Sequence, residues 1–456
     1  MMFNALMVGL AKRNHQVDVI THFPAKNPPP NFKLLIKLNG TFDKVSINSV
    51  VDRDLTAHIA DLRGNKMCEL LGIEEIQKLI KNPPHDPPYD LLVTEVFGAN
   101  CFLGLGYVLN VPVVAVTTSV EYPWVADFNG NHDNLAVVPS YYTTNFDKFK
   151  FSHRLFNFLM RKYLSPDIPN IREVEKSIAL LIVNRSPLID GPKPVTPSMI
   201  EVSGLHLEEN EIPPITPELQ KWLNESEDGV VCFSFGSMVL IETLPLNSIK
   251  ALFESFKKIS PVRILMKIVD ESKLPPGLPE NVKTLPLIPQ QAVLAHKNVR
   301  IFLTHGGLMG CQEALYFGVP MIGVPLFSDQ PQNLDKFVAM NMAIKINYNN
   351  LTTTSLDEAL NAVLYDPKYR ENAKYYAKVF KDRPMKSMDM ATFWIEYVIR
   401  NGNIMKSPAL ELSWWQLTLL DVYGFLLTCL AIAFTVLYRV TRRLMKKVPV
   451  LLAQWS

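Results

Sequence analysis

The sequence predicts an α/β protein built from two units of similar size, followed by one membrane-spanning helix. Three observations predict this organisation. Short, continuously apolar runs alternate with helical stretches, as expected for parallel strands covered on both faces. A charged segment with three prolines, residues 208–217, divides the alternation into two parts. Near the end of the chain, residues 417–438 are apolar apart from Asp421.

The composition is that of a large folded protein. Of the 456 residues, 48% are apolar and 20% are charged. Lys and Arg together number 46 against 44 for Asp and Glu, a net charge of +2, so we expect no nucleic-acid partner. The cysteines lack C-x-x-C spacing, which predicts neither a disulfide framework nor a zinc ribbon. They are Cys68, Cys101, Cys232, Cys311 and Cys429.

The first unit, residues 1–207, begins directly on a helix, with Ala5, Leu6 and Leu10 on one side. In α/β proteins a β-strand normally precedes the first helix, and this sequence begins on a helix without such a strand. It also shows no signal-peptide pattern. We therefore expect the sequence to be truncated at its N-terminus. The unit's expected elements are strands 17–21, 34–38, 91–94, 113–117, 180–183 and 200–202, helices 67–80, 153–163 and 171–178, and a long loop at 122–146.

After the linker, the second unit, residues 218–400, repeats the alternation. Its expected elements are strands 230–235, 263–266, 282–285, 300–304 and 321–324, helices 246–258, 308–317 and 332–342, and further helices to about residue 399. Two such units form a cleft between them. Ligands of parallel sheets bind beyond the carboxyl ends of the strands, so that is where we look for the site.

The apolar stretch at 417–438 is long enough to cross a membrane, because its 22 residues form a helix of about 33 Å. A buried core helix is the competing interpretation, but such a helix rarely lacks a polar face for so long. Basic residues beginning with Arg439 follow at once. The positive-inside rule therefore places the tail, residues 439–456, in the cytoplasm and the preceding body in a lumen or outside the cell.

Polar residues follow three predicted strands of the second unit. The run from Thr304 through His305, Gly306 and Gly307 stands between a strand and a helix. Adjacent glycines there let backbone N–H groups approach an anion, which the helix dipole also favours. Glu313, one turn into the helix, is a candidate acceptor for ribose hydroxyl groups. Together these residues predict a nucleotide site.

The other two strand ends carry Asp329 with Gln330, and Ser237. Taken singly, each has a simpler interpretation: a tight Gly-Gly connection, a helix cap at Asp329, a turn residue at Ser237. Their coincidence at neighbouring strand ends favours a binding cleft. A dinucleotide fold is the runner-up, because Asp329 lies about 20 residues beyond the glycines, although these do not form G-x-G-x-x-G. Neither H-E-x-x-H nor G-x-S-x-G is present, so we expect no metal and no hydrolase elbow.

Several segments of the second unit resemble the donor-binding signature of UDP-glucuronosyltransferases and UDP-glucosyltransferases. Residues 121–124 and 201–206 are similar to the membrane-anchored animal branch of this family, and insect members are the most similar. The signature segments are Leu287-Ile288-Pro289-Gln290-Gln291, Thr304-His305-Gly306-Gly307, Gly318-Val319-Pro320-Met321, Pro325 to Asn333, and Val231 to Met238.

The resemblance implies two facing Rossmann-like domains of the GT-B type and an inverting transfer of a sugar to a small lipophilic acceptor. The donor is UDP-glucose or UDP-glucuronate, a co-substrate, and no cofactor is implied. Residues 1–207 would bind the acceptor and 218–400 the donor. The implied donor contacts are Ser237, His305, Gly306 and Gly307 at the diphosphate, Glu313 at the ribose, Leu287 and Gln290 at the nucleotide, and Asp329 and Gln330 at the sugar hydroxyl groups.

Three positions depart from the family pattern. Leu287 replaces the aromatic residue that stacks on uracil, and Met309 replaces an amide. The family's catalytic acid corresponds to Glu95, whereas the histidine base is expected upstream of Met1. Glu95 alone also fits a buried helix-cap carboxylate. The resemblance gives the catalytic interpretation the advantage.

Two functions therefore follow. The first is an enzyme that conjugates hydrophobic aglycones, with detoxification or hormone and pigment conjugation as its role. The second is a catalytically impaired member that binds UDP-sugar and acts as a partner of active transferases. Either would be a single-pass protein of the endoplasmic reticulum membrane with a lumenal body, alone or in a homo- or hetero-oligomer. The acceptor and the choice between glucose and glucuronate are left open.

Overall fold

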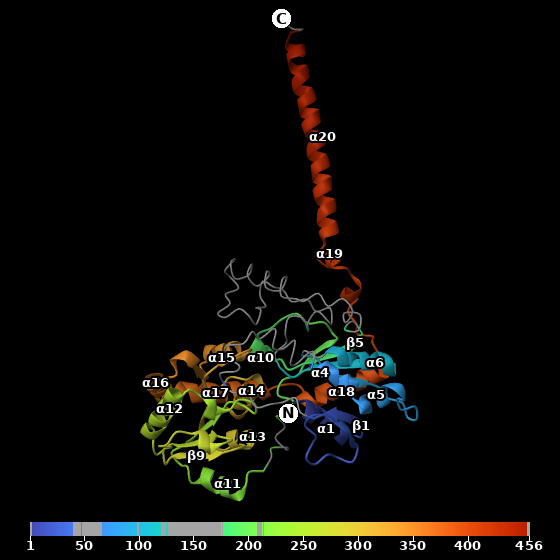
Figure 1. Cartoon of the computed structure of the whole chain (residues 1–456). Coiled ribbons are helices and arrows are strands. Elements are labelled where there is room, and N and C mark those ends of the chain that lie inside the picture. Colours follow the sequence, from blue (N-terminus) through green and yellow to red (C-terminus); the bar gives the residue numbers. More distant parts are fainter. Residues whose placement is uncertain are drawn as a thin grey trace. The chain divides into compact units, whose positions relative to one another are not determined.

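The computed structural model divides the chain into two compact units, Met1–Lys406 and Ser407–Ser456. It describes residues 2–39, 47, 66–97, 100–119, 125, 175, 177–207, 212 and 214–453. The first unit contains a two-stranded, a four-stranded and a six-stranded sheet, and every strand pairing within them is parallel (Figure 1). The fold is therefore α/β, as the apolar runs predict.

The four-stranded sheet has the order β3-β4-β5-β6. Its strands are β3 (Leu92–Glu95), β4 (Val113–Thr117), β5 (Ile178–Val183) and β6 (Met199–Glu201). Side chains of β4 alternate between two buried clusters, so both faces of the sheet are covered. One face packs against α1 (Met2–Lys12) and α18 (Ser387–Asn401). The chain thus returns from the region after the six-stranded sheet to complete this core.

Strands β1 (Val17–Thr21) and β2 (Phe32–Lys37) form the two-stranded sheet next to α1. The predicted helix 67–80 is broken into α4 (Lys66–Glu69), a 3-10 turn and α5 (Glu74–Lys81). Cys68 of α4 and Cys101 form a disulfide across 33 positions. The cysteine spacing did not predict this single bridge, because a disulfide between distant segments leaves no spacing motif.

The six-stranded sheet has the order β12-β11-β10-β7-β8-β9. Because its strands are all parallel, their carboxyl ends share one edge, where Ser234, Thr304 and Gly323 lie in register. The strands are β7 (Val230–Ser234), β8 (Arg263–Lys267), β9 (Val282–Leu285), β10 (Val299–Thr304), β11 (Met321–Gly323) and β12 (Ala343–Lys345).

Helices cover both faces of the six-stranded sheet. Val231 and Phe233 point into a core with α12 and α16, whereas Val230 and Cys232 point into a core with α11, α13, α14, α15 and α17. Because both faces of the sheet are buried, side chains on both faces are apolar, and the strands are continuous apolar runs in the sequence. The helices are α11 (Pro217–Asn224), α12 (Leu246–Lys258), α13 (Gln290–Leu294), α14 (Leu308–Phe317), α15 (Gln330–Ala339), α16 (Thr353–Tyr365) and α17 (Pro367–Lys381).

Most predicted elements of the second half are confirmed, with several ends that differ by one to three residues. Helix α15 runs from Gln330 to Ala339 and not from 332 to 342, and α11 begins at the last residue of the expected linker. Thr216 caps α11 by accepting a hydrogen bond from the Leu219 N–H, and Pro217 stands in its first turn. The loop expected at 122–146 and the helices expected at 153–163 and 171–178 lie outside the described residues, apart from isolated positions and the start of β5.

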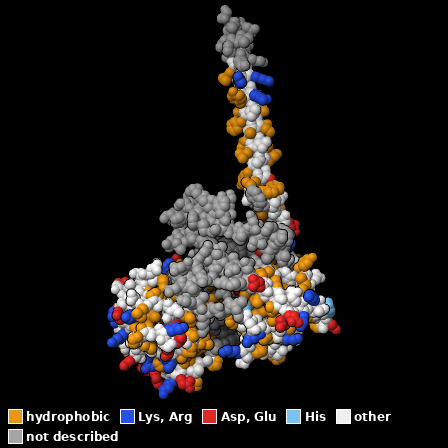
Figure 2. Space-filling view, in the orientation of Figure 1, with side chains coloured by type: hydrophobic (Ala, Val, Ile, Leu, Met, Phe, Trp, Pro, Cys, Tyr) orange, Lys and Arg blue, Asp and Glu red, His pale blue; other side chains and the backbone are white. Residues whose placement is uncertain are grey.

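The compact unit Ser407–Ser456 contains α19 (Trp414–Leu417) and the long helix α20 (Leu420–Ala453). Its segment Leu420–Arg443 is long and apolar enough to cross a membrane. The helix starts later than expected because Leu419, with φ of 54°, separates it from α19. Apolar side chains cover the surface of α20, and basic side chains stand beyond them toward its far end (Figure 2).

Candidate active site

The loops at the carboxyl edge of the six-stranded sheet bring most of the predicted donor residues together. The turn after β10 leads from Thr304 into α14, and the turn after β11 leads into α15. Strand β7 contributes the Gly236 and Ser237 turn. Strands β7, β10 and β11 are neighbours, so the three sequence signals meet at one edge.

The turn between β10 and α14 requires glycine for two separate reasons. Gly306 has φ of 86°, and a Cβ there would lie 2.7 Å from the side chain of Leu334. Gly307 is the N-cap of α14, and its Cβ would lie 2.9 Å from the imidazole of His305. The backbone N–H groups at the start of α14 therefore stay open to a ligand, and the helix dipole favours an anion there.

His305 is a neutral imidazole in this setting. Burial, reinforced by the nearby charge of Lys267, lowers the pKa of His305 from 6.5 to about 4. Its Nδ1 is buried and has no hydrogen-bond partner within the described residues. At neutral pH the ring therefore offers one N–H donor and one acceptor, and no positive charge.

Glu313 of α14 is a carboxylate that is only 1% exposed. Gln290 Nε2 donates to its Oε2 at 2.5 Å, and Gln291 Nε2 donates to its Oε1 at 3.3 Å. His206 Nε2 lies 3.5 Å from the same Oε1. The residues come from α13, from α14 and from the segment that precedes the linker. Two amide donors thus hold the buried carboxylate and compensate in part for its loss of water, and an imidazole stands 3.5 Å away.

Asp329 and Gln330 open α15, but their side chains act differently. Asp329 stands at the N-cap position, yet its side chain makes no capping hydrogen bond, so the simple cap interpretation is wrong. Burial raises the pKa of Asp329, although Asn333 Nδ2 donates to its Oδ2 at 2.6 Å. Asn333 Nδ2 also donates to the Gly306 carbonyl at 3.1 Å. The two turns are therefore tied to one another.

The side-chain oxygen of Gln330 is engaged with the loop before it. It accepts hydrogen bonds from the N–H groups of Leu326 at 2.8 Å and Phe327 at 3.1 Å. Ser237 and Leu287 differ from this, because both are exposed, with Leu287 at 68%. An exposed leucine on the rim presents an apolar surface to a planar ligand without the stacking of an aromatic ring.

The expected catalytic acid, Glu95, is the last residue of β3, at the carboxyl edge of the four-stranded sheet. It is exposed and not a buried cap, and Thr118 Oγ1 donates a hydrogen bond to it. Asn184 Nδ2 donates to the Thr118 carbonyl at 2.9 Å, and Gln312 Nε2 donates to Asn184 Oδ1 at 2.9 Å. A hydrogen-bonded series therefore runs from Glu95 to α14.

Helix α14 contacts both sheets along its first two turns. Leu308 and Met309 pack against the two cores of the four-stranded sheet. Gln312 donates a hydrogen bond to Asn184, and the Glu313 carboxylate lies 3.5 Å from the His206 imidazole, so both reach residues of the first half. Met309, which replaces the family's amide, is thus a packing residue. Sequence reasoning missed His206, Gln291, Asn184 and Gln312 as site residues. Their only signal was a polar residue type at positions that are otherwise apolar.

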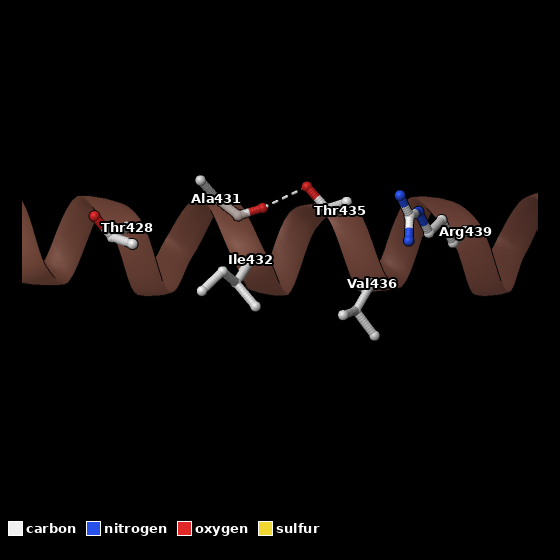
Figure 3. A pocket seen from close by; sticks show the side chains of 6 residues that line it. All are labelled: Thr428, Ala431, Ile432, Thr435, Val436 and Arg439. Carbon is white, nitrogen blue, oxygen red and sulfur yellow. Dashed lines mark hydrogen bonds between the residues drawn. The ribbon is translucent and has the colours of Figure 1, made fainter.

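A shallow depression on α20 lies outside this site. It is lined by Thr428, Ala431, Ile432, Thr435, Val436 and Arg439 (Figure 3). The Thr435 hydroxyl donates to the Ala431 carbonyl at 2.7 Å, so its hydrogen bond stays within the helix. The depression belongs to the segment that is long and apolar enough to cross a membrane, and its lining has no acid or base pair that could serve group transfer.

Solved structures of similar fold are glycosyltransferases. The structure of a UDP-glucose: anthocyanidin 3-O-glucosyltransferase in complex with UDP matches with a TM-score of 0.62 and 19% identity, covering 88% of this chain and 96% of that one. A UDP-glucosyltransferase from Polygonum tinctorium matches with a TM-score of 0.60 and 15% identity, over 88% and 96%. At such identity the likeness concerns the fold, which is the GT-B fold of glycosyltransferases.

Sequence comparisons give the family. The family model of UDP-glucoronosyl and UDP-glucosyl transferase matches residues 85–450. UDP-glucosyltransferase 2 of Dactylopius coccus is 34% identical over 95% of this chain and 88% of its own length. UDP-glucuronosyltransferase 2A1 of Rattus norvegicus is 38% identical over 53% of this chain and 45% of its own length. The chain belongs to the UDP-glycosyltransferase family and is an enzyme that uses a UDP-sugar donor.

Proposed function

We propose that this UDP-glycosyltransferase transfers glucose or glucuronate to a small lipophilic acceptor with inversion at the anomeric carbon. The observation that carries the proposal is the group of polar side chains at the carboxyl edge of the six-stranded sheet, where His305, Glu313 and Asp329 lie on adjoining turns. Residues 218–400 would form the donor domain and 1–207 the acceptor domain. Detoxification or the conjugation of hormones and pigments is the corresponding role.

The donor contacts follow from the chemistry of each group. The neutral His305 ring, Ser237 and the backbone N–H groups of the first turn of α14, after Gly306 and Gly307, bind the diphosphate. Glu313 accepts the ribose hydroxyl groups, and Leu287 with Gln290 contacts the uracil. Asp329 and Gln330 read the hydroxyl groups of the sugar. Glu95 is the acid that would orient the base that removes the acceptor proton, a role that requires a base with a pKa near neutrality.

Transfer assays with the full chain in detergent test this function. We expect a β-glycoside from UDP-[14C]glucose or UDP-[14C]glucuronate with at least one member of a panel of phenols and lipophilic alcohols. Nuclear magnetic resonance of the product gives the anomeric configuration, and an α-glycoside would contradict inversion. Retained UDP binding with no product across the panel would favour the alternative, a UDP-sugar-binding partner of active transferases.

We also propose that α20 anchors the protein in the endoplasmic reticulum membrane with a lumenal body and a cytoplasmic tail. The basic residues Arg439, Arg442 and Arg443 and the Cys68–Cys101 disulfide support this topology, because disulfides persist in oxidising compartments. Asn350-Leu351-Thr352 is a glycosylation sequon whose Asn350 is exposed. Expression in cells behind a cleavable signal peptide should give an endoglycosidase-sensitive mass shift that Asn350→Gln reduces. An unmodified chain would contradict the lumenal body.

A further inference from the structure

His206 occupies the crossing point between the two hydrophobic cores. Its neighbour Leu205 belongs to the core of the four-stranded sheet, and its other neighbour Leu207 belongs to the core of the six-stranded sheet. Both leucines are at most 5% exposed, so the backbone between them has little freedom. The position of the imidazole is therefore set by packing on both sides.

The imidazole of His206 faces the carboxylate of Glu313 and is otherwise without a partner. Its side chain is 2% exposed, and that of Glu313 is 1% exposed. Nε2 lies 3.5 Å from Glu313 Oε1, and within the described residues neither ring nitrogen has a hydrogen bond. A buried polar group without a hydrogen bond costs about 1–3 kcal/mol. Such a cost at a packed position points to a role that the ligand completes.

Gln291 links the backbone of His206 to the same carboxylate. Its Nε2 lies 3.3 Å from the His206 carbonyl and 3.3 Å from Glu313 Oε1, and it donates to both. Gln290 holds the other oxygen, Oε2, at 2.5 Å. Three side chains therefore surround the Glu313 carboxylate: those of Gln290, Gln291 and His206. Of these three, only His206 comes from the first half of the chain.

We propose that His206 is a positioning residue for ribose recognition: when the UDP-sugar binds, its Nε2–H, 3.5 Å from Glu313 Oε1 in this structure, donates to that oxygen, so that the remaining carboxylate lone pairs face the 2′- and 3′-hydroxyl groups. This inference rests on the proposed role of Glu313. A hydrogen bond to a carboxylate is stronger than one between neutral groups. Because His206 precedes the linker, ribose binding also engages the first half of the chain.

Titration calorimetry with UDP, 2′-deoxy-UDP and 3′-deoxy-UDP tests the proposal on the full chain in detergent. The wild type should prefer UDP over each deoxy analogue. His206→Ala should weaken UDP binding by about tenfold and bring the ratio of UDP to deoxy-UDP affinity toward one. His206→Gln, whose amide N–H can replace Nε2–H, should keep the ratio, whereas the shorter His206→Asn should not. His296→Ala is the matched control, because that ring bonds Asn224 at 3.0 Å.

Glu313→Gln tests the ribose role of Glu313 separately from the positioning role of His206. An unchanged ratio in Glu313→Gln would overturn the ribose role of Glu313 and the inference with it. A ratio that collapses in Glu313→Gln and is unchanged in His206→Ala would overturn the inference alone. Equal weakening of all three ligands by His206→Ala would show a purely structural role. Should His206→Ala fail to fold, the pair His206→Gln and His206→Asn decides: equal ratios in the two variants overturn the proposal.

Discussion

The carboxyl edges of the two larger sheets have the same topology but carry different chemistry. At the six-stranded edge, Glu313 and Asp329 are carboxylates removed largely from water, and each is held by side-chain amides. At the described part of the four-stranded edge, Glu95 is exposed and accepts a hydrogen bond from the Thr118 hydroxyl. A site that always binds the same nucleotide gains from groups oriented before the ligand arrives, because ordering them on binding would reduce affinity.

The two edges also differ in how they are held. The six-stranded sheet has a core on each face and contains the buried thiols Cys232 and Cys311, for which burial raises the pKa of each thiol. The segments beside the four-stranded sheet are joined by the Cys68–Cys101 disulfide. Covalent linkage therefore supports segments beside the four-stranded sheet, and we expect that removing it lowers the stability of that region more than that of the six-stranded sheet.

The largest effect is expected from breaking that linkage. Cys68→Ser or Cys101→Ser should destabilise the region around β3 by about 3–4 kcal/mol, the loop-closure value for a separation of 33 residues. Segment-resolved hydrogen exchange should show faster exchange in β3 and unchanged protection in β10. Cys429→Ser, at an exposed free cysteine, is the control. Equal acceleration in both sheets would mean that they unfold as one unit.

Next in size is the loss of a sugar contact at the six-stranded edge. Asp329→Asn should lower the transfer rate by about a hundredfold, since hydrogen bonds to a charged group are worth roughly 1.5–3 kcal/mol. UDP affinity should change by less than about threefold, because UDP lacks the sugar. Asp357→Asn, at a carboxylate paired with Lys258 at 2.6 Å, is the matched control. A fall in UDP affinity as large as the fall in rate would exclude a sugar-specific role for Asp329.

Much of the six-stranded edge could be predicted because its determinants are local. The Gly307 N-cap and the left-handed Gly318 C-cap define α14, and its predicted bounds are confirmed. The apolar runs of β7 and β10 likewise predict strands buried on both faces. Local sequence was sufficient there because the residues that begin, end and fill each of these elements lie within or next to it in the chain.

The contacts that prediction missed join residues far apart in the chain. Cys68 gives no sign that Cys101 lies beside it, and His206 gives no sign of Glu313, 107 positions later by their numbers. Asn184 and Gln312 are both buried and bond each other, yet each alone resembles an ordinary surface amide in sequence. Strand β12 has only three residues, too few for a periodic pattern. Tertiary packing, not local preference, fixes these features.

A smaller effect concerns the diphosphate. His305→Ala should weaken UDP binding by about fivefold to a hundredfold, equivalent to roughly 1–3 kcal/mol for a lost hydrogen bond. Calorimetry with UDP measures the change in affinity. His296→Ala is the control, because it removes an imidazole near the same sheet that has no expected contact with UDP. Unchanged affinity in His305→Ala would remove this residue from the diphosphate site and leave the N–H groups of α14 as the anion donors.

The expected effect that is smallest within any one pH unit is the acid sensitivity that the six-stranded edge owes to His305. The pKa of this group is about 4 in the folded chain and about 6.5 when unfolded, so between these values the unfolded chain binds more protons. Stability contributed by the neutral ring is therefore present above pH 6.5 and is lost as the pH falls toward 4, with a slope of at most about 1.4 kcal/mol per pH unit. His305→Gln removes the titrating group, and its melting temperature should depend less steeply on pH across this window than that of the wild type. Asp329 titrates in both proteins and cancels in the comparison. Parallel profiles would show that His305 is as accessible to protons in the folded chain as in the unfolded one, and the proposed neutral donor at the diphosphate would have to be abandoned.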